Sequence, residues 1–448
     1  VHETDGDDFY TNDGLWDTYR CMHPLQMIIE PERRSDILQS YVRMYEQSGW
    51  MPAFPGIAGG GNANVMIGHH ATAMISDSHC KGFTDFDAVK AYEGMRKNAL
   101  QKTMLSRYNG DGRATELDSV YYQKGFFPAL APGQEEWVPQ VNQGMRRQSV
   151  SVTLEHCFDD WALAQMAQRL GYAEDHARFM ERAHNYRNLF HVETGFMRPR
   201  TADGTWIEPF DPIWSGGHGG RDYYTEMNGW DYTWFVPHDP EGLIRLMGGR
   251  QAFLEKLHTY FTTTVDLYAS RSKFHFLSQF PDKTGWIGMY SQGNEPDHHI
   301  PYLYNYAGQP WMTQRRVRQI MDIWFGDVPM GVPGDEDGGS MSAWYVFSAM
   351  GFFPFSPGRP TYDIASPVFE KITLDVGDGK RFVIEAPGAS AQNKYIQSAT
   401  LNGKPLDKPW FEHRELAKGG KLVLEMGPRP NKEWGSAPGD APPSMTAN

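Results

Sequence analysis

Paired helical segments between about residues 16 and 350 constrain the fold of this chain more than any other feature. Their apolar residues recur at the three- and four-residue spacing of one helix face. Ser35 and Asp36 are expected to start one helix, and Gly82 and Gly171 to end two others. The segments with this spacing are 16–29, 35–47, 62–82, 86–100, 149–171, 174–190, 241–261, 298–325 and 340–352. The pattern predicts a mainly α chain.

Two kinds of helix occur in this region. The segment 340–352, SMSAWYVFSAMGF, is apolar on more than one face, whereas its neighbours are apolar on one side. A helix that is apolar all round is buried, and a one-sided helix is half-exposed, so roughly six such pairs predict an (α/α)6 toroid. Functional groups are expected on the loops of such a scaffold. Long loops rich in Gly, Trp and Pro lie at 50–61, 191–240 and 281–297.

After residue 354 the pattern changes to an alternation of apolar and polar residues, which is typical of strands. The segments 362–376, 381–388, 395–403 and 421–428 show it. Turn sequences such as GDGK and NGKP separate them, which predicts an antiparallel sheet. We therefore expect a catalytic toroid at 1–353, a β-rich subdomain at 354–435 and a disordered tail at 436–448.

The charge and composition exclude some classes of partner. The formal net charge is −13, and the sequence has no cluster of Lys and Arg of the kind that nucleic-acid binding needs. No run approaches the roughly 18 apolar residues of a membrane span. We expect neither a nucleic-acid nor a membrane partner. Aromatic residues reach 14%, which fits either a large aromatic core or platforms for sugar rings.

The sequence GVPGDEDGGSMSAW at 331–344 places three acids directly before a predicted buried helix. A helix N-terminus stabilises negative charge, and flanking glycines let the backbone approach a ligand. In an extended loop Asp335 and Asp337 would face one side and Glu336 the other. The acids are therefore either a general base with a helper carboxylate or an acidic helix start on the surface.

Glu226 lies in the aromatic segment YYTEMNGWDYTWFVPHD at 223–239. A carboxyl group among aromatic rings loses water, so its pKa rises and it can stay protonated near neutral pH. A general acid needs this property. The alternative is a hydrogen-bonded structural glutamate.

The segment SQGNEPDHHIPYLYNY at 291–306 offers four side-chain oxygens within six residues, at Gln292, Asn294, Glu295 and Asp297. Hard oxygen ligands at this spacing suit calcium, although such a turn needs no metal. His298 and His299 do not indicate zinc, because adjacent histidines do not easily reach one ion and no HExxH motif is present. They either contact sugar hydroxyls or start a helix.

Trp16, Asp17 and Arg20 stand at the first helix, in DGLWDTYR at 13–20. Asp17 is suited to accept hydrogen bonds from two adjacent hydroxyls, and Trp16 to stack on a ring. The alternative is a capped helix with an Asp17–Arg20 ion pair. Further polar residues suited to supporting a site are Glu155, Asp159, Asp160, His69 and His70.

Together these segments resemble glycoside hydrolase family 92, the calcium-dependent α-mannosidases. The motifs that resemble the family are LWDTYR, YTEMNGWDYTWFVPHD, GNEPDHHIPYLYNYAGQPW and PGDEDGGSMSAWYVFSAMGFFPFSPG, and the resemblance spans about residues 10 to 430. It implies an N-terminal β-sandwich that meets the (α/α)6 domain at the active site. We expect that sandwich upstream, in the same protein or on a separate chain. The resemblance also implies a secreted or periplasmic protein.

The resemblance implies an exo-acting, inverting hydrolase that removes terminal α-mannose from N-glycans or mannans. It makes Glu226 the general acid and Asp335 with Asp337 the base, of which Asp337 takes the water proton. It places calcium on the GNEP segment, with Asn294 and Glu295 as ligands and Gln292 as a further candidate. The remaining site residues, as substrate contacts, are Trp16, Asp17, Arg20, His298 and His299. The alternatives are another (α/α)6 carbohydrate enzyme, a glucosidase or lyase, and a non-catalytic glycan-binding protein.

Overall fold

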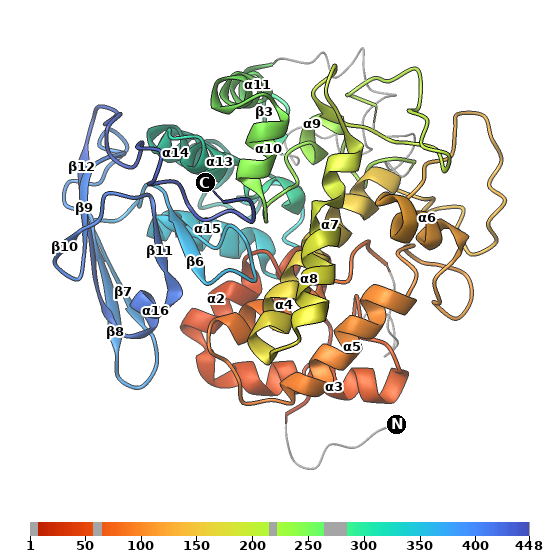
Figure 1. The fold of residues 1–448 in the computed structure, drawn as a ribbon. Helices are drawn as coiled ribbons and strands as arrows, with labels where there is room; N and C mark the ends of the chain where they lie inside the picture. Colours follow the sequence, from red (N-terminus) through yellow and green to blue (C-terminus); the bar gives the residue numbers. More distant parts are fainter. Residues whose placement is uncertain (1–7, 57–64, 215–221, 264–284, 448) are drawn as a thin grey trace. The chain divides into compact units, whose positions relative to one another are not determined.

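The computed structural model describes residues 8–56, 65–214, 222–263 and 285–447 (Figure 1). Contacts within the chain divide it into two compact units. Unit 1 comprises Val1–Tyr19, Ser35–Val236 and Thr263–Pro281, and unit 2 comprises Arg20–Arg34, Pro237–Thr262 and Asp282–Asn448. Parts of the predicted helix 62–82 and of the three predicted long loops lie outside the described residues. The predicted boundary at 353/354 stays a prediction.

Unit 1 consists mainly of helices. They are α1 (Leu15–Thr18), α3 (Arg34–Ser48), α4 (Ala71–Cys80), α5 (Ala88–Gln101), α6 (Glu116–Lys124), α7 (Ser149–Leu170), α8 (Ala173–Arg182), η2 (Ala183–Leu189) and α9 (Gly229–Tyr232). The short strands β1 (Phe190–His191) and β2 (Phe196–Met197) pair antiparallel. α7 is buried along nearly its whole length and packs against α4, α5 and α8 (yellow and orange in Figure 1). It coincides with the helix predicted for 149–171, and Gly171, whose φ is +83°, follows its last residue as predicted.

Two predicted helix ends in unit 1 are wrong by local geometry. α3 begins at Arg34, after the 3-10 helix η1 (Pro31–Arg33), so Ser35 and Asp36 lie inside its first turn instead of capping it. α4 begins at Ala71, later than predicted, because residues 65–70 are not helical and Gly68 among them has a left-handed φ of +80° that a regular helix does not contain.

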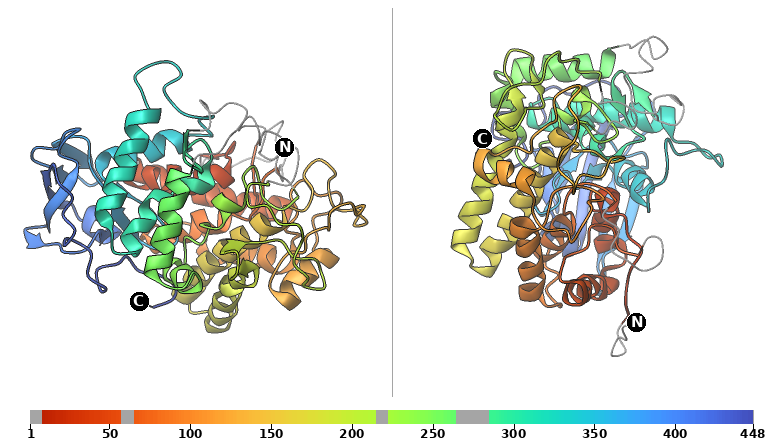
Figure 2. Two further views of the ribbon diagram at one scale, coloured as in Figure 1. Left: turned by 90° about the horizontal axis from the view of Figure 1, so that it is seen from above. Right: turned by 90° about the vertical axis from the view of Figure 1, so that its right-hand side faces the viewer.

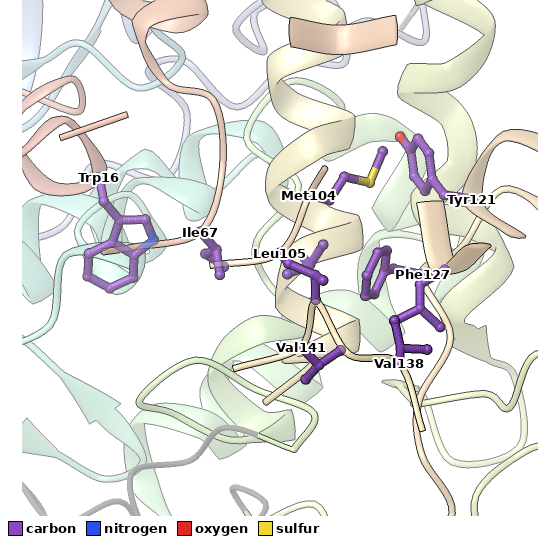
Figure 3. Close-up of a cluster of buried hydrophobic side chains, with 10 residues drawn as sticks. Trp16, Ile67, Met104, Leu105, Tyr121, Phe127, Val138 and Val141 are labelled. Carbon is purple, nitrogen blue, oxygen red and sulfur yellow. The ribbon is translucent and has the colours of Figure 1, made fainter. Parts of the chain in front are cut away.

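A cluster of buried apolar side chains joins α1, α6 and α7 to the segment between α5 and α6 (Figure 3). Its members are Trp16, Ile67, Met104, Leu105, Leu117, Tyr121, Phe127, Val138, Val141 and Val152. Full burial of one such side chain contributes roughly 1.5–3 kcal/mol. The cluster therefore fixes the residues that precede α7 onto that helix.

Unit 2 contains the other helices of the described residues and most of their strands. Its helices are α2 (Met22–Ile29), η1, α10 (Pro240–Leu246), α11 (Arg250–Thr262), η4 (Glu295–Asp297), η5 (Ile300–Tyr302), α13 (Leu303–Tyr306), α14 (Pro310–Trp324), α15 (Ser340–Met350) and α16 (His413–Ala417). α15 packs against α2 and α14. Among the described helices, none has both the length and the apolar character that crossing a membrane requires.

Among the described residues, the strands of unit 2 form two larger sheets and one short pair; the strands of the five-stranded sheet are blue in Figures 1 and 2. The five-stranded sheet has the order β10 (Lys404–Pro405), β9 (Tyr395–Leu401), β12 (Gly420–Gly427), β8 (Arg381–Glu385), β7 (Lys371–Asp375). The three-stranded sheet has the order β11 (Trp410–Glu412), β6 (Thr361–Ile364), β5 (Phe352–Phe353). β3 (Trp286–Ile287) pairs with β4 (Tyr290–Ser291).

The sequence predicts an antiparallel sheet, but one pair of strands in the five-stranded sheet is parallel. β12 inserts between β9 and β8, pairing antiparallel with the former and parallel with the latter. A parallel pair needs a long connection, and the chain between Glu385 and Gly420 supplies one through β9, β10, β11 and α16. The alternation of apolar residues gives a strand its buried face but not its direction.

The end of the chain is ordered up to residue 447, where the sequence predicts a disordered tail. Ser444 Oγ and Thr446 Oγ1 each donate to the carboxylate of Asp239 at 2.8 Å. Asp239 is buried and caps α10 by accepting from Gly242 N. A buried carboxylate needs several donors, and the tail provides them.

Candidate active site

Glu226 lies in a segment of unit 1 that is anchored at both ends. Upstream, Tyr223 O accepts from Val150 N at 2.9 Å and from Ser151 N at 3.3 Å, at the start of α7. Downstream, Asn228 caps α9 in a capping box. Glu226 itself is half-buried. The anchors hold its backbone in place while its side chain keeps access to solvent.

Thr225, directly before Glu226, is tied to the same end of α7. Its backbone N donates to Ser151 Oγ at 2.7 Å, and its Oγ1 donates to Gln148 Oε1 at 2.7 Å. Gln148 stands 77 residues earlier in the chain and is the N-cap residue of α7. These long-range hydrogen bonds were not predicted from the sequence.

Two of the three predicted catalytic carboxylates have a left-handed backbone conformation, with φ of +60° at Glu226 and +51° at Asp337. A few per cent of non-glycine residues adopt positive φ, and such strain concentrates at functional sites. The conformation costs of order 1–3 kcal/mol and persists where the surroundings impose it. The catalytic roles of these residues stay predictions.

A buried ionic network supports α7 in unit 1. The two ring nitrogens of His70 lie 2.9 Å from Asp159 Oδ1 and 2.9 Å from Glu155 Oε2. Burial lowers the pKa of His70, but the charges of Asp159 and Glu155 outweigh it and raise that pKa to about 9. The imidazolium form therefore holds the two carboxylates in place.

Glu155 links this network to two aromatic residues. Its Oε1 accepts from Trp16 Nε1 at 3.2 Å and from Tyr232 Oη at 3.4 Å. Asp160, by contrast, pairs with Arg182 Nε at 2.8 Å. Of the residues suggested as support, Glu155, Asp159 and His70 thus form one hydrogen-bonded network. Through Tyr232, this network contacts the segment that follows Glu226.

Replacing His70 with Ala is expected to lower the free energy of unfolding by about 3–5 kcal/mol, since it leaves buried carboxylates without their cation. Because the pKa of His70 is raised in the folded state, its contribution is complete below about pH 6.5 and is lost as the pH rises through about 9. Urea unfolding of both proteins between pH 6 and 10 measures this, with the exposed His258→Ala as control. A difference that stays constant with pH would rule out the charged role.

Trp16 was predicted to stack on a sugar ring, but it packs into the apolar cluster and is 3% exposed (Figure 3). Its indole N–H is used by Glu155. This favours a core role for Trp16. Asp17, on the same short helix, is buried, and Arg20 belongs to unit 2.

The acidic loop before α15 lies in unit 2, and its three acids differ in their contacts. Glu336 accepts from Gly339 N at 2.5 Å and Ser342 N at 3.0 Å, so it caps α15. Burial away from water raises the pKa of the Asp337 carboxyl group most, and the negative charge of Asp335 raises it further. The base role of Asp337 and the helper role of Asp335 stay predictions.

Asp337 also lies beside Glu295, and one carboxylate oxygen of each lies within 4.8 Å of the other. A hydrogen bond with Glu295 lowers the pKa of Asp337 and so opposes the rise. Glu295 is 2% exposed and its neighbour Asn294 is 4% exposed. Two close carboxylates repel each other unless a proton or a cation lies between them.

Two residues that flank the GNEP sequence, Gln292 and Asp297, form hydrogen bonds within this turn. Asp297 Oδ2 accepts from Tyr260 Oη at 2.7 Å and from Ser291 N at 2.9 Å. Gln292 Oε1 accepts from Tyr290 Oη at 2.5 Å, which turns this amide towards the protein interior. The hydrogen bonds favour structural roles for Asp297 and Gln292. For Gln292 this interpretation competes with the predicted role as a metal ligand.

His298 is buried, and its Nε2 lies 3.2 Å from the carbonyl oxygen of Gln292. Burial lowers its pKa to about 3, with a further contribution from the charge of Arg20. Its ring is therefore neutral and part of the turn, which favours the helix-start interpretation. His299 is also buried and meets the ring of Phe355 edge-on at 5.5 Å.

Comparison with known proteins identifies the family. The model described as the glycosyl hydrolase family 92 catalytic domain matches residues 1–428. A protein of Arthroderma benhamiae named "Uncharacterized secreted glycosidase" is 29% identical over 456 residues, which cover 96% of this chain and 53% of that protein.

Solved structures of the same family are similar along nearly the whole chain. The α-mannosidase BT3965 from Bacteroides thetaiotaomicron has a TM-score of 0.84 at 32% identity, over 99% of this chain and 53% of that one. Its complex with mannoimidazole has a TM-score of 0.85 at 31% identity, over 100% and 55%. The inverting mannosidase BT2199 from the same species has a TM-score of 0.83 at 35% identity, over 98% and 56%.

These similarities confirm the predicted fold class, a mainly α chain with small sheets, and are consistent with the (α/α)6 toroid. The chain spans about half the length of the relatives that it matches. The family model, in contrast, covers nearly the whole chain. The chain therefore belongs to glycosyl hydrolase family 92.

Proposed function

We propose that this chain supplies the catalytic carboxylates of an exo-acting, inverting α-mannosidase that removes terminal α-mannose from N-glycan or mannan chains. The main support is that Glu226 and Asp337, in two separate motifs of a family 92 domain, share the strained backbone typical of functional residues. Solved relatives bear the names α-mannosidase and inverting mannosidase. One of them was solved with mannoimidazole bound.

In this mechanism Glu226 donates a proton to the oxygen that leaves with the rest of the glycan. Asp337 takes a proton from a water molecule on the opposite face of the sugar, and the product is β-mannose. Asp335 assists because its negative charge raises the pKa of Asp337, and a carboxylate of higher pKa is a stronger base. Each carboxylate thus has one proton to move.

The residues around Asp337 fit a calcium site. Glu295 and Asn294 are buried oxygen donors, and the close pair of Glu295 and Asp337 carboxylates would be relieved by a cation. When bound, calcium would supply positive charge and ligand positions for two sugar hydroxyls. We propose Glu295 and Asn294 as its ligands.

Calcium is expected to stabilise the protein as well as support activity. A ligand at about 100 times its Kd adds about 2.7 kcal/mol to the free energy of unfolding. We expect the Tm of EDTA-treated protein to rise on adding calcium, and this rise to be lost in Glu295→Gln. The control Glu425→Gln, exposed on β12, should keep it. An unchanged Tm in all three proteins would contradict the site.

The proposed function is tested by incubating the full-length protein with α-1,2-, α-1,3-, α-1,4- and α-1,6-linked mannobioses. Release of mannose from at least one is expected. An α-linked glucobiose and a uronic-acid polysaccharide serve as the substrates of a glucosidase and a lyase. Cleavage of either of these without mannose release would replace the proposal, and binding without cleavage would indicate a glycan-binding protein.

Secretion and an upstream β-sandwich complete the proposal. The Arthroderma benhamiae relative is named as secreted, and the matched relatives are about twice as long as this chain. We propose that the remaining part of the protein contains the sandwich, and that the mature enzyme acts on mannose-containing oligosaccharides outside the cytoplasm.

A further inference from the structure

The side chain of Glu226 differs in exposure from those on both sides of it. Every other residue from 223 to 229 is buried, whereas Glu226 is half-buried. The φ of +60° at Glu226 is left-handed, which changes the direction of its side chain relative to that in a regular extended chain. A residue with a Cβ rarely adopts this conformation without support from its surroundings. The contacts that support it are therefore important for where the carboxyl group lies.

Thr225, which precedes Glu226, is fixed to α7 at two points. Its backbone N donates to Ser151 Oγ at 2.7 Å, and its Oγ1 donates to Gln148 Oε1 at 2.7 Å. All three residues are buried. With both its backbone and its side chain held, Thr225 restricts the backbone positions that are open to the next residue.

Gln148 has two features that do not favour stability. It is 1% exposed, yet its Nε2 has no hydrogen-bond partner among the described residues. A buried donor without a partner lowers the stability of the folded protein. Gln148 also has a left-handed backbone, with φ of +48°. Such costs persist at sites where a contact serves function, and the side chain of Gln148 bonds to Thr225.

The helix on the other side of this contact is rigid. α7 is buried along nearly its whole length. Val152, in its first turn, belongs to the buried apolar cluster, and Glu155 lies 2.9 Å from the imidazolium of His70. The start of α7 is thus fixed independently of the Glu226 segment. A hydrogen bond to it can hold that segment in a conformation that the segment does not prefer by itself.

We propose that Gln148 and Thr225 are positioning residues for the general acid. Their hydrogen bond holds Glu226 in its left-handed conformation and so directs the carboxyl group to the oxygen that leaves. The inference rests on the proposed function, because Glu226 is the residue that would donate the proton. Neither Gln148 nor Thr225 exchanges a proton with the substrate. Without their contact, Glu226 would adopt a more common backbone conformation and its carboxyl group would move.

Thr225→Val tests this, because valine keeps the size and branching of threonine but cannot donate. We expect kcat for a mannobiose to fall by about 10- to 100-fold, since a displacement of about 1 Å has an effect of this size. KM should hardly change. Hydrolysis of α-mannosyl fluoride should fall by less than about threefold, because fluoride leaves with little help from a general acid. Thr225→Ser, which keeps the hydroxyl group, should behave like the wild-type protein on both substrates.

A double variant tests whether the two residues act through one hydrogen bond. Gln148→Met removes the acceptor and the unpartnered amide together, and it should show the same selective loss as Thr225→Val. The protein with both substitutions should lose no more kcat than either single variant, because the second change removes a contact that is already absent. Losses that multiply in the double variant would contradict a shared positioning contact.

Thr103→Val is the matched control. Thr103 is buried in unit 1, and its Oγ1 donates to Asp118 Oδ2 at 2.9 Å. This variant should lower the Tm and leave kcat for both substrates unchanged, which separates lost stability from lost positioning. An unchanged kcat in Thr225→Val, or equal losses on both substrates, would overturn the positioning role. A wild-type protein that cleaves neither substrate would instead refute the proposed function.

Discussion

Asp337→Asn is expected to lower kcat for α-mannoside hydrolysis by a factor of about 10² to 10⁴, the contribution of a positioned general base. An amide cannot accept the proton of the attacking water, whereas its size and shape preserve the loop. KM should change little, because the loss falls on the transition state. Steady-state kinetics on a mannobiose measure both constants.

The neighbouring acid provides the control for this variant. Glu336→Gln alters the residue that caps α15, so it should cost about 0.5–2 kcal/mol of stability and leave kcat within twofold. If Asp337→Asn retained more than a tenth of the wild-type kcat, another residue would have to be the base.

Glu226→Gln is expected to separate substrates by their leaving groups. A sugar alkoxide departs poorly without a proton, so hydrolysis of a mannobiose should fall by about 10² to 10⁴. Fluoride needs little help from a general acid, so hydrolysis of α-mannosyl fluoride should fall far less. The ratio of the two losses measures proton donation separately from binding.

Glu174→Gln makes the same chemical change on the exposed face of α8 and should leave both activities unaltered. Equal loss on the two substrates in Glu226→Gln would show that Glu226 positions the substrate or supports the fold. In that case the general acid would have to be sought among other carboxylates of the chain.

The helical periodicity and Gly171 were sufficient to predict α7, because a long buried helix with a left-handed glycine after it leaves a local pattern. The parallel pairing of β12 with β8 leaves no local pattern in the sequence, since the direction of a strand depends on the path of the chain between the two strands. The same limit explains the tail, whose order depends on Asp239, roughly two hundred residues earlier.

Within the candidate site, the sequence predicted residue types better than contacts. The sequence predicted that Glu336 faces away from Asp335 and Asp337, but it did not predict the hydrogen bonds of Glu336 to Gly339 N and Ser342 N. The hydrogen bond from Thr225 to Gln148 joins residues far apart in the chain, and no spacing rule reaches that distance. Trp16 shows a second limit, because an aromatic residue beside Asp17 has the same sequence pattern whether its ring meets a sugar or the core.

The configuration of the first-formed product tests the central claim most directly. Proton NMR recorded in the first minutes of mannobiose cleavage by the full-length protein distinguishes the two anomers before they interconvert. Single displacement by Glu226 and Asp337 predicts that β-mannose appears first and α-mannose only later, by mutarotation. Initial release of α-mannose would contradict the account, because retention requires a covalent intermediate that these roles do not provide.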